Sequence, residues 1–512
     1  MSGFSTFVHM GIVFRQSVKN SIVTALGAIL GAAIIWLSTK YIGKRELGFL
    51  GNFTNYAVSL SQILLLGLNS TLVVYIHRFA DDVKRKRLLI TWCLLLPGVI
   101  AAVAGIVYML ARQWILNHFQ PADQPLMAQY FVWLPVFTLL FIYLVLLEQY
   151  LGSQMKVAIS AFMREVVLRV ASIALILLFA FGYVGFSTLV IGTVLVYLLP
   201  VFIMLLLATR TRDFGFSRHI TDLTKSEYRE MVHFSWYHFL LTASVLLIGY
   251  MDALLLPFYD HQGFSAVAVY RVAVFLISFL QLPLKALIPA SFTVLAKAFA
   301  ENDLPKAADL FLRSSVNIFI ATVAIALLLC CNLSNVVLLI KDGYDDIVPV
   351  FLILFIGNMV NIATGMNDQV LSIANYYKFN FYLSISLLVV LFILIRTLVP
   401  DYGIFGAAWS TTATIVVFNT VKCIFVWRKL RMLPFSRKTL LVVAAALPAL
   451  AAGYFLPHFF TRQAHTYLYP VFDTVLRSSV IVVIYTVMLV WLKPSKDLES
   501  YLLSIRQNKR LF

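Results

Sequence analysis

The sequence predicts an all-α integral membrane protein with about fourteen transmembrane helices, because of its composition and the grouping of its apolar residues. Of the 512 residues, 61% are hydrophobic and 12% are charged, whereas about a quarter of the residues in soluble domains are charged. The apolar residues form runs of about 18 or more, the length that crosses a bilayer as a helix. A soluble globular protein is therefore excluded.

The apolar runs are distributed along the whole chain. They cover about 20–38, 47–75, 88–110, 129–149, 158–180, 184–208, 232–257, 265–297, 314–333, 347–366, 370–395, 403–427, 438–457 and 470–492. The first run follows Arg15 and Lys19, as the apolar part of a signal peptide would, but it is long and Lys40 follows it without a convincing cleavage site. We therefore interpret it as an uncleaved spanning helix.

The positive charges predict the orientation of the chain. The formal net charge is +17, and the Lys and Arg residues lie in short loops, where they set membrane topology and do not indicate nucleic-acid binding. With both termini in the cytoplasm, the inner loops hold about thirty of these residues and the outer loops about eight, which is the bias of cytoplasmic loops. An even number of spans agrees with this orientation.

The sequence carries no motif for enzyme chemistry. It has no phosphate-binding P-loop, no HExxH and no loop long enough to form a catalytic domain. The four cysteines lie in or beside apolar runs without metal-site spacing, at positions 93, 330, 331 and 423, and are interpreted as small core residues. The sequence therefore predicts neither an enzyme nor a metal or cofactor site, and leaves transport or a membrane scaffold.

The eighth run is unusual because it contains two cations. Arg271, Ser278 and Lys285 are seven residues apart, so on one continuous α-helix they lie above one another on one face. Gln281 falls on the same side. Polar and charged residues inside a span are directed at water, a counter-charge or a polar ligand. This stripe favours a cavity lining over snorkelling of the two cations toward the headgroups.

Two other runs carry polar stripes. In the second run these residues are Asn52, Asn55, Ser59, Gln62 and Asn69. In the tenth run and just after it they are Asn358, Asn361, Gly365 and Asp368. Such residues also serve as hydrogen-bonding contacts between packed helices. Stripes on three runs from both halves of the chain favour a shared aqueous cavity.

The two acidic residues that lie near helix ends are candidates for ion coupling or for structural pairing. Asp252, near the outer end of the seventh run, is a plausible counter-charge for Arg271, and Asp368 follows the tenth run. A structural salt bridge and a functional role are both compatible with the spacing of these residues.

An internal duplication organises the chain. A charged loop, Thr209 to Glu230, separates six runs from the remaining eight, and a shift of 219 positions places Ser59 on Ser278 and Gln62 on Gln281. Both helices then cross the membrane in the same direction, which is typical of a parallel duplication. The sequence predicts two pseudo-symmetric six-helix lobes around a central cavity, 1–225 and 226–430, and two additional helices with a tail, 431–512.

Three stretches resemble bacterial oligosaccharide and polysaccharide flippases of the O-antigen translocase type. These flippases belong to the multidrug/oligosaccharidyl-lipid/polysaccharide exporter superfamily. The stretches are YIGKRELGFLGNFTNYAVSLSQILLLGLNSTLVVYI, MDALLLPFYDHQGFSAVAVYRVAVFLISFLQLPLKALIPASFTVLAKAF and VPDYGIFGAAWSTTATIVVFNTVKCIFVWRKL. The second stretch has the acidic Asp252 before its turn and Tyr270 soon after it, and the third has the proline, Tyr-Gly and Gly-Ala-Ala sequence of the family's twelfth helix.

The resemblance implies a function as well as a fold. It implies transfer of an undecaprenyl-diphosphate-linked oligosaccharide from the cytoplasmic to the periplasmic leaflet of the bacterial inner membrane by alternating access. In the related lipid II flippases, arginines on helices one, two and eight line the cavity, and only Arg271 matches one of these. Arg271 and Lys285 are then expected to attract the diphosphate, and the Asn and Gln side chains of the three stripes to bind sugar hydroxyls.

Partners and alternatives follow from this hypothesis. The expected partners are the lipid-linked glycan, membrane lipids, and a glycan polymerase and glycosyltransferases. A cation-coupled multidrug exporter of the same fold is the main alternative, and it would be expected to use acidic residues in its cavity. A scaffold for glycan assembly is the third.

Overall fold

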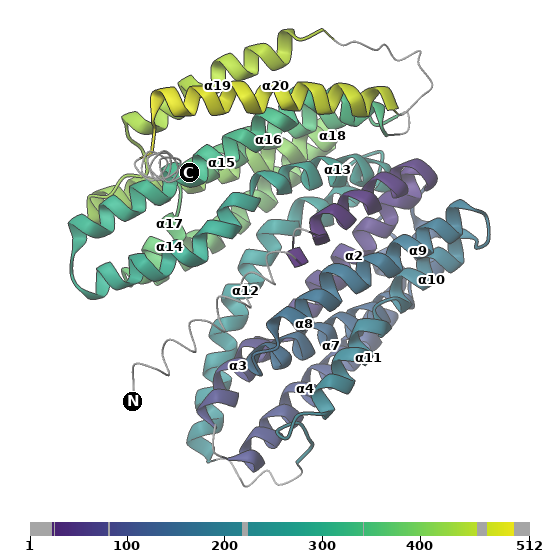
Figure 1. Cartoon of the computed structure of the whole chain (residues 1–512). Helices are drawn as coiled ribbons and strands as arrows, with labels where there is room; N and C mark the ends of the chain where they lie inside the picture. Colours follow the sequence, from purple (N-terminus) through teal and green to yellow (C-terminus); the bar gives the residue numbers. More distant parts are fainter. Residues whose placement is uncertain are drawn as a thin grey trace, which may run out of the picture. The chain divides into compact units, whose positions relative to one another are not determined.

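The structure is a computed structural model that describes residues 23–24, 26–79, 82–217, 224–340, 343–457 and 468–495. Within these residues every regular element is a helix. The chain forms two compact units, residues 1–268 and 269–512, and each is described by itself (Figure 1). Arg15, Lys19, the start of the first predicted run and the C-terminal tail lie outside the described residues.

The first unit is built around one central helix. Its helices are Leu26–Tyr41, α2 (Lys44–Leu64), α3 (Leu68–Arg78), α4 (Val83–Leu110), α5 (Arg112–Leu116), α6 (Gln124–Tyr130), α7 (Trp133–Ser153), α8 (Val157–Phe162), the π-helix η1 (Met163–Val167), α9 (Leu168–Ala180), α10 (Phe186–Leu195), α11 (Leu198–Thr209) and α12 (Lys225–Tyr259). Helix α7 packs against α2, α3, α4 and α11. Its Phe137 ring contacts Phe53 of α2 and Tyr197, at centroid distances of 6.0 and 5.0 Å.

Helix α12 completes the first unit. It packs against α2 and α3, and Tyr56 of α2 donates a hydrogen bond from its hydroxyl to the Leu254 carbonyl oxygen at 3.1 Å. Near its beginning, the hydroxyls of Ser235 and Thr71 are 2.5 Å apart. The pair α2–α3 therefore contacts α12 at two positions that are 19 residues apart, Ser235 and Leu254.

The second unit contains the remaining helices. Helix α13 (Phe264–Leu280) crosses the boundary between the units, and α14 (Leu282–Ala300), α15 (Leu304–Leu338), α16 (Ile347–Ala363), α17 (Asn367–Ile373), α18 (Tyr377–Leu430), α19 (Arg437–Phe455) and α20 (Leu468–Leu492) follow it. Helices α15, α19 and α20 lie side by side (Figure 1). Their shared core includes Phe319, Val442, Ala445, Ile481 and Tyr485.

The predicted apolar runs coincide with helices throughout the described residues. Among the described residues, eight helices are long and apolar enough to cross a membrane, and ten are when the bent pairs α2–α3 and α13–α14 each count as one span. Helix α18 counts there as one, although its backbone is non-helical at Gly403, with φ 55° and ψ −135°. Only glycine adopts this conformation readily, and the break separates the predicted runs 370–395 and 403–427. The expected all-helical membrane architecture is confirmed.

The eighth predicted span differs from the expected continuous helix. Its two parts, α13 and α14, meet at an angle of 40°, with Gln281 between them and proline in the first turn of α14. Pro283 has no N–H for the helical ladder and its ring clashes with the preceding turn, so the helix bends there. The sevenfold spacing therefore does not place Lys285 on the same straight face as Arg271.

Candidate functional site

The break between α13 and α14 joins two of the predicted polar residues. The Nε2 atom of Gln281 donates a hydrogen bond to Oδ1 of Asn358 on α16, at 3.0 Å. Asn358 is 5% exposed, and its own Nδ2 donates to the Leu354 carbonyl oxygen at 3.0 Å. On the other side of the break, Thr322 of α15 donates to the Leu280 carbonyl oxygen at 3.4 Å. The break is therefore stabilised by side chains of two neighbouring helices.

The other predicted residues on these helices differ in their exposure. Arg271 on α13 is half-buried, and Lys285 on α14 is exposed. Ser278 donates its hydroxyl hydrogen to the Phe275 carbonyl oxygen of its own helix at 2.6 Å. Asn361 lies three residues after Asn358, on the same face of α16, and is half-buried. The second unit thus presents two cations and a joined pair of amides along α13, α14 and α16.

The predicted residues on α2 belong to the first unit. Asn55 and Gln62 are half-buried, whereas Asn52 and Ser59 are 0% and 5% exposed. Both amide atoms of Asn52 and the hydroxyl of Ser59 have no hydrogen-bond partner among the described residues. A buried polar group without a partner costs about 1–3 kcal/mol. Both side chains are buried in this conformation, so a ligand reaches them only if the packing around α2 changes.

The two acidic residues have different surroundings. Asp252 on α12 is 6% exposed, and its carboxylate accepts a hydrogen bond from the Ala253 N–H at 2.7 Å. Its pairing with Arg271, which lies in the other unit, stays a prediction. Asp368 on α17 forms an ion pair with Lys422 of α18, with Oδ1 and Nζ 2.5 Å apart.

Lys422 belongs to this region too, although its sequence pattern did not predict it. Its side chain is 4% exposed, and that of its partner Asp368 is 50% exposed. Its Nζ also lies 3.7 Å from the centroid of the Phe418 ring. One turn before Lys422, Asn419 accepts a hydrogen bond from Thr364 at 3.4 Å, and the buried Asn367 amide has no partner among the described residues. A lysine inside the apolar run 403–427 was the available signal, because a buried cation requires a counter-charge.

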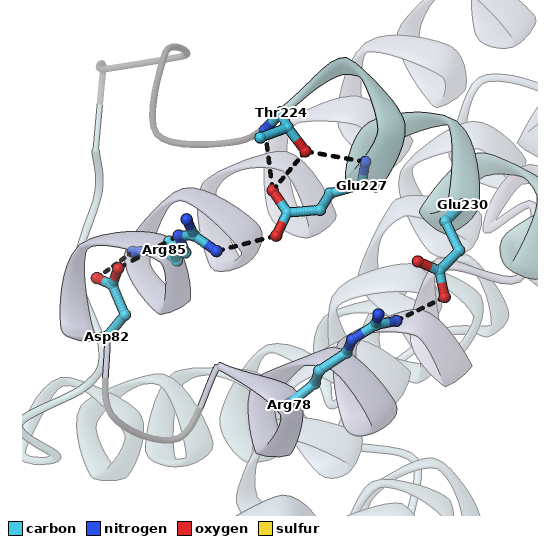
Figure 2. A network of polar contacts seen from close by, with 6 residues as sticks. All are labelled: Arg78, Asp82, Arg85, Thr224, Glu227 and Glu230. Atoms are coloured by element: carbon cyan, nitrogen blue, oxygen red, sulfur yellow. Dashed lines mark hydrogen bonds and ion pairs between the residues drawn. The ribbon is translucent and has the colours of Figure 1, made fainter.

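A network of charged residues joins the end of α3 and the start of α4 to the start of α12 (Figure 2). Arg78 contacts Glu230 at 2.6 Å and Arg85 contacts Glu227 at 2.9 Å. Asp82 caps α4 by accepting the N–H groups of Lys84 and Arg85. The hydrogen bond from Arg78 lowers the pKa of Glu230, and hydrogen bonds from the Thr224 backbone and hydroxyl lower that of Glu227. Both glutamates are therefore ionised throughout the physiological pH range.

No metal site is apparent in the part of the chain that the structure describes. It contains no group of three or more His, Cys, Asp and Glu side chains that is arranged to hold a metal ion.

Comparisons with known proteins identify the fold. No family model matches the chain, and no curated protein matches its sequence. Among solved structures, it is similar to the lipid II flippase MurJ in an inward closed conformation, with a TM-score of 0.70, 14% identity, and coverage of 92% of this chain and 100% of that one. It is also similar to an inward-facing multidrug resistance MATE transporter of the MOP superfamily, with a TM-score of 0.65, 16% identity, and coverage of 80% and 94%.

A MATE structure in the straight conformation gives a TM-score of 0.55 at 16% identity, with coverage of 82% of this chain and 96% of that one. At such identities the comparisons establish the fold alone. The chain is a multi-pass membrane protein with the transporter fold shared by the MATE exporters and the MurJ flippase. This fold is the one implied by the resemblance to the exporter superfamily.

Proposed function

We propose that the protein flips an undecaprenyl-diphosphate-linked oligosaccharide from the cytoplasmic to the periplasmic leaflet of the bacterial inner membrane. The observation that carries this proposal is the arrangement at the α13–α14 break. Gln281 and Asn358 form a hydrogen-bonded pair of amides, and along the chain Arg271 lies ten residues before Gln281 and Lys285 four residues after it. Cations suit a diphosphate, and amides suit sugar hydroxyls because they both donate and accept hydrogen bonds.

The proposed transport cycle is alternating access between two six-helix lobes, 1–225 and 226–430, about a central cavity. The two bent spans of the fold, α2–α3 at 47° and α13–α14 at 40°, are the counterparts in the predicted duplication. Bends at equivalent spans support the duplication and supply equivalent positions at which the lobes change shape. The glycan is moved without chemical change, and glycosyltransferases and a polymerase act before and after this step.

The alternative, a cation-coupled multidrug exporter, is favoured by the similarity to MATE structures. Such a cavity requires an available acidic residue. The carboxylate of Asp368 is paired with Lys422, and residues 264–300 of α13 and α14 contain no acidic residue. The buried Asp252 is then the remaining candidate for ion coupling, while the two cations of α13 and α14 favour an anionic substrate.

The test is a pair of double variants in a strain whose surface glycan depends on this protein. In cells that carry the double variant Arg271→Ala with Lys285→Ala, carrier-linked oligosaccharide is expected to accumulate at the inner leaflet. The control is Lys297→Ala with Lys306→Ala, which removes the same charge from residues that pair with Glu301 at the surface. Normal surface glycan in the first variant, at wild-type protein level, would overturn the assignment. Hypersensitivity of a deletion strain to cationic dyes, with intact glycan, would support the exporter.

A further inference from the structure

An apolar cavity of about 200 Å³ lies between α3, α4 and α12 in the first unit. Its aromatic walls are Trp92, Tyr228 and Trp236, and its aliphatic walls include Leu66, Leu68 and Leu96. The hydroxyls of Thr71 and Ser235 also line it, but they are 2.5 Å apart and satisfy each other. A cavity without free polar groups does not hold water and fits a hydrocarbon group.

The cavity is accessible from outside the unit. Tyr228 and Trp236, which stand on its rim, are 49% and 53% exposed. Trp92 contacts Tyr228 with ring centroids 6.2 Å apart. Tryptophan and tyrosine at the end of a span belong to the headgroup level of a membrane, so a chain that enters this cavity comes from the adjacent lipid leaflet.

Exposed cations surround the same end of α4 and α12. Lys84, Arg87, Lys225 and Arg229 are all exposed, and none forms an ion pair with a described acidic residue. The neighbouring acidic residues already form ion pairs with other cations. The pairs are Glu227–Arg85, Glu230–Arg78 and Asp213–Lys86.

Two of the cations are near cavity-lining residues along their helices. Arg229 is adjacent to Tyr228 in the sequence, and Arg87 precedes Trp92 by five residues, about 7.5 Å along the helix. Exposed cations and the lining of the apolar cavity are therefore on neighbouring turns of α4 and α12.

We propose that this is a binding site for an anionic phospholipid. One acyl chain enters the cavity and the phosphate of the headgroup lies against the cations of α4 and α12. Exposed clusters of Lys and Arg beside a span attract anionic lipids with about 1 kcal/mol for each cation. The cavity is smaller than the 300–1,000 Å³ that is typical of a pocket for a whole ligand, so it fits part of one hydrocarbon chain, and the cations of α4 and α12 favour a chain that carries an anionic headgroup.

The proposed lipid site lies beside the bend between α2 and α3. Leu66 and Leu68 line the cavity on both sides of Gly67, at the bend between α2 and α3. A Cβ atom on Gly67 would be 2.1 Å from the Ser235 carbonyl oxygen, so the two backbones are in close contact there. A chain in the cavity packs against both helices at this contact. Lipid binding therefore stabilises the α3–α12 contact, whatever the protein transports.

The experiment uses the full-length protein in a nonionic detergent and brominated lipids, which quench nearby tryptophans. Brominated phosphatidylglycerol is expected to quench more than brominated phosphatidylcholine, and Trp92→Phe with Trp236→Phe is expected to remove the difference. Leu96→Phe fills the cavity and is expected to abolish binding. Its matched control is Leu95→Phe, at a position that does not line the cavity and is 54% exposed.

Charge variants provide a second test of the proposal, because they leave the cavity unchanged and apply even if a cavity variant does not fold. Lys225→Gln with Arg229→Gln is expected to weaken phosphatidylglycerol binding about 25-fold, about five-fold for each cation. Arg428→Gln with Lys429→Gln, which removes two exposed cations from the second unit, is expected to leave it unchanged. Equal quenching by both lipids, equal loss in the two charge variants, or displacement by polyprenyl phosphate but not by phosphatidylglycerol would overturn the proposal. None of these readouts depends on transport.

Discussion

Gln281 and Asn358 are joined by a 3.0 Å hydrogen bond at the point where the eighth span breaks into α13 and α14. Because Asn358 is almost fully buried, its carbonyl oxygen depends on Gln281 for this contact. The bond therefore connects the shape of a bent span to a polar residue on a different helix.

The first prediction concerns this bond. Gln281→Ala and Asn358→Ala are each expected to lower the free energy of unfolding in detergent, with a coupling energy of about 0.6–1.7 kcal/mol between them. The double-mutant cycle is measured with the purified protein. Strict additivity of the two substitutions would contradict the structural role of the bond, and Asn361→Ala, on the same face of α16, is the control.

The second prediction uses the unequal burial of Lys422 and Asp368. Asp368→Ala leaves a buried ammonium group without its counter-charge, and is expected to destabilise by about 2–4 kcal/mol, since solvent reaches part of the pair. Lys422→Met leaves a carboxylate that water solvates, so its cost is expected to be about 1 kcal/mol or less. Unfolding in detergent measures both. Equal losses of unfolding free energy in the two variants would show that the burial of Lys422 does not determine how each substitution affects stability.

The third prediction is a pH dependence of the contact in Figure 2. Glu227 and Glu230 have lowered pKa values in the folded protein, so their stabilising effect is present above the ordinary carboxyl pKa and is lost as the pH falls through the lowered values. The protection factors of the amides in the first turns of α12, which correct for the intrinsic pH dependence of hydrogen exchange, are expected to fall with acidification in this range.

Glu227→Gln with Glu230→Gln is expected to remove that pH dependence. Glu301→Gln, at an exposed ion pair of the second unit, serves as the control and is expected to retain it. An unchanged pH profile in the double variant would show that other groups control the contact.

The fourth prediction compares two glycines with the same backbone conformation. Gly67 and Gly182 both have φ of +77°, where an alanine costs about 1–2 kcal/mol. Nothing lies within 4 Å of a Cβ on Gly182, whereas one on Gly67 would be 2.1 Å from the Ser235 oxygen and 2.8 Å from the Phe239 nitrogen. Gly67→Ala is therefore expected to cost about 1–3 kcal/mol more than Gly182→Ala. Equal unfolding temperatures would indicate that α3 and α12 separate easily.

The positions of the helices were predictable because a membrane requires long apolar runs, and these are directly readable. The bend at Gln281 was not, because the sevenfold spacing of Arg271, Ser278 and Lys285 assumes a straight helix. Pro283 was the signal that should have limited that assumption. Periodicity describes a face only as far as the helix remains regular.

The candidate site was predictable in part. The polar stripes indicated Gln281 and Asn358, and the structure joins them. Lys422 was missed because its partner Asp368 lies 54 residues away and a lysine near the end of an apolar run is also compatible with snorkelling. The burial of Lys422 depends on packing between α17 and α18, and the sequence pattern around Lys422 does not indicate that packing.

The carboxylate of Glu227 forms hydrogen bonds with two different parts of the first unit. One oxygen, Oε2, accepts hydrogen bonds from the Thr224 backbone and hydroxyl, and the other, Oε1, accepts one from Arg85. The capping box of α12 and its ion pair with α4 therefore share one carboxylate. A change in the rotamer of Glu227 breaks both sets of contacts together, so the loss of one is coupled to the loss of the other.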